Sequence, residues 1–204
     1  MITLYEVPCS TNVERVQLAL AHKGLACEHI SVSYDDRSLI HRVSGQGLVP
    51  VLDHDGRIVV DSMEIVRYLE GQFPNQPLYP TDPARRSELL IFIDWFNRVW
   101  KRPPNLINDE LEKPNPDSAK CKAWADEIAG FLPLFEALLQ GRAYLFGDTF
   151  TAADVCAFPF LKYAAALPAD DPYLFHKILN QHQPLEKFPA IATWIQRVDQ
   201  HPRA

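Results

Sequence analysis

The sequence predicts two domains, an α/β domain in the N-terminal third and an all-helical domain after it. Strand-like and helix-like segments alternate over residues 2–72, whereas large apolar residues recur at helical spacing from residue 89 onward. Four prolines separate the two parts at intervals of three, a spacing that favours an extended linker: Pro74, Pro77, Pro80 and Pro83. We therefore expect domains at 1–73 and 85–204, with 74–84 as the linker.

The first elements form a β-α-β unit. A strand ends at a turn that contains Pro8, a helix follows until Gly24, and a half-buried strand then alternates apolar and polar residues. The expected ranges are Ile2–Tyr5, Asn12–Gly24 and Cys27–Ser33. Tyr34–Ser44 is polar, and we expect an irregular connection or a single helical turn there.

A β-hairpin follows this unit. Val49–Leu52 and Ile58–Val60 are β-branched and apolar, and Asp55-Gly56 between them tolerates the positive φ of a tight turn. Pro50 begins the first strand and is a candidate for a cis peptide bond.

A helix begins directly after the hairpin. Asp61 is placed to accept from the first free helical amides, and Glu64, three residues later, is placed to reach back to it. The helix ends near Phe73. An unpaired backbone edge at Val49 beside a helix N-terminus suits a short peptide with a free carboxylate.

The second half reads as core helices. One helix stops before Pro103-Pro104, and Pro133 is expected to kink or split the next. Thr151 with Asp154 forms a capping box, and Phe150 packs against Val155 as its hydrophobic staple. The expected helices are Leu89–Trp100, Ala119–Leu139, one beginning at Thr151, and Phe188–Ile195.

Composition limits the classes of function. The 204 residues are 47% hydrophobic and carry 20 basic against 26 acidic side chains, a net charge of −6, so neither nucleic acid nor an anionic membrane is expected as partner. The cysteines have no metal-ligand spacing, and no metal is expected. Neither a leader segment nor a span of ~20 apolar residues is found, which makes the cytoplasm the expected compartment.

These motifs resemble a known family. V-P-x-L, the D-G hairpin and D-S at the helix start resemble the glutathione-binding half of the glutathione transferase superfamily, and the order of elements resembles its thioredoxin-like domain. Residues 147–154 are similar to the capping box of its helical domain, G-x-x-h-[ST]-x-A-D. The resemblance covers essentially the whole chain. It implies a homodimeric detoxification enzyme that joins glutathione, its co-substrate, to a small hydrophobic electrophile.

A thiol attacks as the thiolate, so such an enzyme must stabilise S⁻ near neutral pH. Ser10, five residues before Arg15, resembles the serine of the phi and tau classes and the threonine of the bacterial nu class. Asn12 matches an asparagine found near the thiol in nu-class relatives. The alternative for Ser10 is an N-cap serine without a catalytic role, and the alternative for Asn12 is an ordinary first-turn residue of the helix.

Cys9 offers a different chemistry. Pro-Cys-Ser resembles the Ala-Cys-Ser of beta-class transferases, whose cysteine forms a mixed disulfide with glutathione, whereas the omega-class cysteine falls at the position of Ser10. Cys9 would then make the protein a glutathione-dependent disulfide or dehydroascorbate-type reductase. Its other interpretation is a small buried side chain. A non-enzymatic binding or regulatory protein of this fold is the third alternative.

The resemblance also assigns binding residues. It gives Val49 backbone pairing with the cysteinyl part of glutathione, and gives Asp61 and Ser62 its γ-glutamyl end. Leu48 and Asp35-Asp36 depart from the family's glycyl-end pattern, and His41 or Arg42 is the candidate substitute. A second-substrate wall is expected from Trp95, Phe96, Val99 and Trp100, with one of them facing the cleft.

Overall fold

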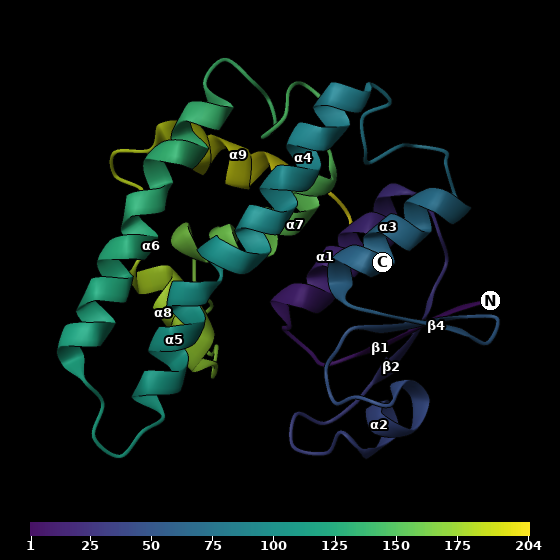
Figure 1. The fold of residues 1–204 in the computed structure, drawn as a ribbon, viewed down its shortest axis with the longest axis horizontal. Coiled ribbons are helices and arrows are strands. Elements are labelled where there is room, and N and C mark those ends of the chain that lie inside the picture. Colours follow the sequence, from purple (N-terminus) through teal and green to yellow (C-terminus); the bar gives the residue numbers. More distant parts are fainter. The chain divides into compact units, whose positions relative to one another are not determined.

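The chain, described over residues 1–204 by a computed structural model, divides into two units. Met1–Pro80 and the segment His201–Ala204 make up the first, and Thr81–Gln200 makes up the second. All four strands lie in the first unit, while the second contains only helices (Figure 1). The predicted fold class, an α/β part followed by an all-helical part, is confirmed.

A mixed sheet with strand order β2-β1-β3-β4 forms the centre of the first unit. β1 pairs in parallel with β2 and antiparallel with β3, and β3 pairs antiparallel with β4. The hairpin turn falls at Asp55 and Gly56, whose φ angles are 52° and 87°, as the sequence predicts. The strands are β1 Ile2–Glu6, β2 Glu28–Ser31, β3 Val51–His54 and β4 Arg57–Val60.

Three helices cover the sheet. α1 (Thr11–His22) and α3 (Ser62–Gln72) pack side by side on one face, and α2 (Ser38–Ser44) lies on the other (Figure 1). α2 is longer than the single turn expected from its polar sequence, because buried Ile40 packs into the core with three buried valines: Val7, Val32 and Val51.

The segment His201–Ala204 packs on α1. Arg203 donates from Nε and Nη2 to Oε1 of Glu14 at 3.2 and 2.9 Å, and the amide of Ala204 donates to the carbonyl of Gln17 at 3.2 Å. The first unit is therefore built from two pieces of sequence that are separated by residues 81–200.

The first helix of the second unit begins before the predicted end of the linker. Pro83 was expected in the extended linker, but it opens helix α4 (Pro83–Trp95). A proline is tolerated in the first turn because no intrahelical partner awaits its missing N–H. Asp82 caps this helix by accepting from the amide of Arg85 at 2.9 Å.

The remaining helices differ from expectation in three places. The helix predicted to end at Trp100 changes to a π-helix over its last turn, and Pro103-Pro104 lie in the first turn of a further helix instead of ending the helical region. Pro133 does not split its helix. The bounds are η1 Phe96–Trp100, α5 Arg102–Leu111, α6 Ser118–Leu139, α7 Ala152–Leu161, η2 Lys162–Ala164, α8 Leu174–Gln181 and α9 Pro189–Asp199. No helix has both the length and the apolar character required to cross a membrane.

The predicted capping box at α7 is confirmed, and its Asp154 also accepts hydrogen bonds from residues outside α7. Oδ1 of Asp154 accepts from the amide of Leu145 at 3.0 Å and from the indole N–H of Trp194 at 2.8 Å, while Oδ2 accepts from the amide and hydroxyl of Thr151 at 2.9 and 3.0 Å. Burial raises the pKa of the Asp154 carboxyl, although these hydrogen bonds act in the opposite direction. Asp154 thus joins the start of α7 to α9 and to the preceding loop.

Candidate active site

Three connections meet at one edge of the sheet. Tyr5 lies opposite Val51 in the β1–β3 pair, and Val51 lies opposite Val60 in the β3–β4 pair. β1 and β4 therefore run in the same direction and end at the edge where β3 begins. Since α1 follows β1 and α3 follows β4, both helices direct their N-terminal amides toward this edge. The predicted residues from Cys9 to Asn12, Val49, and Asp61 to Ser62 all belong to these connections.

Ser10 is the N-cap of α1. Its backbone is extended, with φ −69° and ψ 121°, and its Oγ accepts from the amide of Val13 at a long 3.4 Å. The side chain is half-buried. Because the cap uses a lone pair of the oxygen, the hydroxyl hydrogen is left to donate to another acceptor. A donor at a helix N-terminus is the arrangement that stabilises a thiolate.

Cys9 precedes Ser10 in the turn after β1. Its φ is 63°, and its side chain is exposed. The alternative of a small buried residue is therefore wrong for this cysteine. An accessible thiol here has the room to form a disulfide with a small molecule.

Val49 presents its main chain at the same edge. The predicted cis bond between Val49 and Pro50 is confirmed. The Val49 side chain packs on the hydrophobic cluster around Val51. The backbone amide and carbonyl of Val49 make no hydrogen bond within the chain. Leu48 beside it is 77% exposed, and both its backbone groups bond to the side chain of Gln46.

Asp61 is the N-cap of α3. Its Oδ1 accepts from the amides of Met63 at 2.9 Å and Glu64 at 3.1 Å, while Oδ2 takes no part in the cap. The residue is exposed and is therefore able to accept from a cationic group of a ligand. The prediction that the Glu64 side chain reaches back to Asp61 is wrong, because the Glu64 carboxylate pairs with Arg67 one turn later.

Arg15 was predicted only as a marker for the alignment of Ser10, but in the structure its side chain lies under the site. The side chain is 1% exposed, and Nη1 donates to Oδ1 of Asn12 at 3.3 Å and to Oγ of Ser62 at 3.2 Å. Arg15 thereby ties the first turn of α1 to that of α3. The sequence feature that could have revealed this role is an arginine on the apolar face of the helix, because a buried charge requires hydrogen-bond partners.

The residues expected near the glycyl end lie around α2. His41 and Arg42 are exposed on this helix, and a Cβ at Gly47 would lie 2.9 Å from Nε2 of His41. Asp35 and Asp36 are exposed as well. Hydrogen bonding from Ser38 lowers the pKa of the Asp36 carboxyl.

The aromatic residues expected at the second-substrate wall separate into two kinds. Trp100 is fully buried and stacks on Phe96 with ring centroids 4.5 Å apart, which corrects its assignment to a pocket wall. Trp95 is half-buried against Phe131, and Val99 is 40% exposed. Trp95 and Val99 are therefore the two that remain as candidates.

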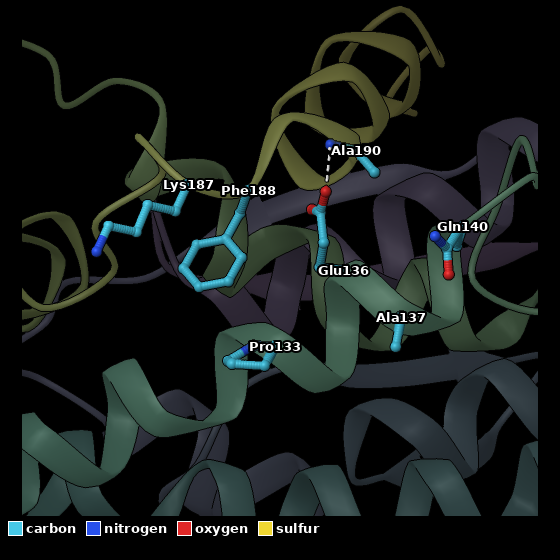
Figure 2. Close-up of a pocket in the computed structure, with 7 residues that line it drawn as sticks. All are labelled: Pro133, Glu136, Ala137, Gln140, Lys187, Phe188 and Ala190. Atoms are coloured by element: carbon cyan, nitrogen blue, oxygen red, sulfur yellow. Dashed lines mark hydrogen bonds between the residues drawn. The ribbon is translucent and has the colours of Figure 1, made fainter.

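A cavity of about 300 Å³ lies within the second unit, between the C-terminal part of α6 and the start of α9 (Figure 2). The Glu136 carboxylate points across it to the first turn of α9, where it accepts from the amides of Ala190 at 3.0 Å and Ile191 at 3.1 Å. None of the predicted site residues lines this cavity. Its lining residues are Pro133, Glu136, Ala137, Gln140, Lys187, Phe188 and Ala190.

The site at the sheet edge thus combines hydrogen-bond donors, one carboxylate and one exposed thiol. Ser10, Asn12 and Ser62 lie at or beside two helix N-termini, Arg15 adds a buried positive charge, and Asp61 supplies the acceptor. Such a set suits a ligand with a carboxylate, an ammonium group and a thiol. No group of three or more histidine, cysteine or acidic side chains is arranged to hold a metal ion.

Comparison with known proteins gives two family matches. Residues 4–77 match the sequence pattern described as glutathione S-transferase, N-terminal domain, and residues 93–197 match that described as glutathione S-transferase, C-terminal domain. Glutathione S-transferase GstB of Escherichia coli K12 is 32% identical over 172 residues, covering 79% of this chain and 82% of its own.

Two further comparisons span nearly the whole chain. FtsZ-localized protein A of Caulobacter vibrioides is 27% identical over 212 residues, 98% of this chain and 87% of its own. The crystal structure of a glutathione S-transferase from Rhodospirillum rubrum F11 aligns with a TM-score of 0.78 at 28% identity, covering 99% of this chain and 89% of that one.

Proposed function

Because the chain belongs to the glutathione S-transferase family, we propose that it transfers the thiolate of glutathione to a small hydrophobic electrophile and acts through Ser10. The observation that carries this proposal is the Ser10 hydroxyl, which caps α1 with its lone pair and keeps its hydrogen for a thiolate.

Glutathione binds along the edge of the sheet in this proposal. The cysteinyl backbone pairs with the main chain of Val49, whose amide and carbonyl have no partner in the chain. The γ-glutamyl ammonium binds the Asp61 carboxylate, and the α-carboxylate of the γ-glutamyl residue accepts from the hydroxyl and amide of Ser62 at the start of α3. The thiol then lies over the start of α1, beside Ser10 and Asn12.

The reaction is a displacement or an addition at the sulfur. The thiol proton leaves to solvent, and Ser10 donates to the sulfur and lowers the pKa of the bound thiol. The thiolate forms a C–S bond with the electrophile, and an aromatic halide releases halide ion. Trp95 or Val99 supplies apolar contact to the second substrate.

A matched set of Ser10 variants tests this role. Ser10→Ala removes a donor to a charged acceptor, worth roughly 1.5–3 kcal/mol, so the bound thiol pKa should rise by about 1–2 units. Turnover with an aromatic halide at neutral pH should fall about 10- to 100-fold. Ser10→Thr keeps the hydroxyl and should retain most of the activity. A pH–rate profile with an unshifted thiol pKa in Ser10→Ala would remove Ser10 from the mechanism.

A reductase is the second candidate, favoured by the exposed Cys9 beside Ser10. In that reaction the Cys9 thiolate would attack a substrate disulfide and release one of its thiols. A first glutathione would displace the other substrate thiol and form a mixed disulfide with Cys9, and a second would attack the glutathione sulfur, which releases glutathione disulfide and restores the Cys9 thiolate. Two glutathiones are then oxidised as the substrate is reduced. Loss of disulfide reduction in Cys9→Ala, with conjugation retained in that variant, would support this second activity.

The third candidate is a non-enzymatic protein of the same fold. FtsZ-localized protein A matches 98% of this chain, and its name describes localization rather than catalysis. Calorimetry that detects no glutathione binding would overturn the proposed transferase and favour this interpretation. We also propose a homodimer, and sedimentation should then give twice the chain mass of 23.2 kDa.

A further inference from the structure

Arg15 is the buried cation of α1 nearest the site. Its exposed fraction is 1%, and one nitrogen, Nη1, lies within hydrogen-bond distance of two oxygens, Asn12 Oδ1 at 3.3 Å and Ser62 Oγ at 3.2 Å. Asn12 and Ser62 are 50 residues apart in sequence. Both lie in the first turn of a helix whose N-terminus faces the sheet edge.

The chemistry of a guanidinium fixes the direction of these hydrogen bonds. It has five N–H donors and no acceptor, so only oxygen can face it favourably. The Ser62 oxygen must therefore accept from Arg15, and its own O–H hydrogen is left to point elsewhere. Asn12 must likewise turn its carbonyl oxygen, and not its NH₂ group, to Arg15.

We propose that Arg15 is a positioning residue that makes Ser62 a hydrogen-bond donor toward the ligand and so selects a carboxylate at the γ-glutamyl end. This inference rests on the proposed function. Without Arg15, the Ser62 hydroxyl can equally accept from a neutral amide of a ligand. With Arg15 in place, the Ser62 hydroxyl donates to that position beside a buried positive charge, and a carboxamide there presents N–H groups to a donor and a cation instead of to an acceptor.

The first test needs no ligand. Nuclear magnetic resonance of the wild-type protein should show the Arg15 Nη protons with hindered rotation and slow solvent exchange. The double variant Asn12→Ala, Ser62→Ala should show faster rotation and faster solvent exchange of these protons. Identical Arg15 signals in the two proteins would show that these oxygens do not hold the guanidinium, and would overturn the proposal.

The second test measures ligand choice by calorimetry. The two ligands are glutathione and its analogue in which the γ-glutamyl α-carboxylate is converted to a carboxamide. Wild type should prefer glutathione by about 10-fold or more, the range expected when one charged hydrogen-bonding group is lost. Arg15→Met should bring the ratio to within about 3-fold, and Arg15→Lys should restore part of it, since a buried cation is kept.

A double-mutant cycle and a control separate positioning from general stability. If Arg15 acts through Ser62, Ser62→Ala should change the ligand ratio far less in the Arg15→Met background than in wild type. Arg203→Met, which removes the ion pair to Glu14 of the same helix, should leave the ratio unchanged. Equal losses of affinity for both ligands in Arg15→Met would reduce Arg15 to a structural role.

Failure of the proposed function would look different. Wild type that binds neither ligand would overturn both the transferase and the ligand side of this inference, whereas the ligand-free signals would still report whether Arg15 orients its two neighbours. Wild type that binds glutathione and its carboxamide equally would leave the transferase in place and overturn the selection of a carboxylate.

Discussion

Replacing Asp154 by alanine tests whether one buried carboxylate holds the helical unit together. The side chain has no exposed surface and accepts hydrogen bonds from Leu145, Thr151 and Trp194. Alanine would leave three buried N–H donors without a partner, and each such loss costs about 1–3 kcal/mol. Relaxation and entry of water offset part of that sum, and the burial that raises the pKa of the Asp154 carboxyl shows that the carboxylate itself carries a desolvation cost.

We therefore expect a loss of about 4 kcal/mol in the free energy of unfolding, whereas a simple N-cap is worth about 1 kcal/mol. The matched control is Asp117→Ala, because Asp117 caps α6 in the same unit through the amides of Ala119 and Lys120 but is exposed. Urea denaturation followed by circular dichroism would compare the two variants. Equal losses would refute the claim that Asp154 does more than cap its own helix.

Three other expectations concern the site and its surroundings. Asp61→Asn keeps an oxygen for the α3 cap but removes the charge, so calorimetry should show glutathione binding weakened by about 10-fold, and unchanged affinity would exclude the ammonium contact. Glu136→Ala removes the acceptor for two α9 amides and should lower the urea midpoint by the equivalent of about 1–2 kcal/mol, whereas Lys187→Ala on the same cavity should not. Burial raises the pKa of the Cys27 thiol to about 11, so about 0.1% of it is thiolate at pH 8. Alkylation followed by mass spectrometry should therefore show that Cys27 reacts more slowly than the exposed Cys9, and equal rates would contradict this.

The parts of the fold that the sequence predicted well are those fixed by local chemistry. Asp55-Gly56 permits the positive φ of the hairpin, and Thr151 with Asp154 specifies a helix start, so both could be located from a few neighbouring residues. Pro83 failed as a marker of the linker because proline is compatible with two states, an extended segment and the first turn of a helix. The residues on the C-terminal side of a proline decide between these two states.

The candidate site was predictable as a set of residues but not as a network. Ser10 and Asp61 are recognisable as caps from their own positions, whereas the role of Arg15 depends on Ser62, 47 residues away. The assignment of Trp100 to the pocket wall was wrong for a different reason. Helical spacing alone cannot distinguish a side chain that faces a ligand from one that stacks on Phe96 in the core. Side chains whose partners lie on other elements need the tertiary structure.

The contact between Arg203 and Glu14 has a consequence for the order in which the chain acquires its structure. A ribosome releases residues 81–200 before the segment that completes the first unit, so the continuous helical unit is free to form while α1 still lacks its last partner. Closing a loop of that length costs entropy that only the later contacts offset. The contacts of Arg203 and Ala204 with α1 can therefore form only after the whole helical unit has been synthesised, and they involve residues outside the proposed binding site.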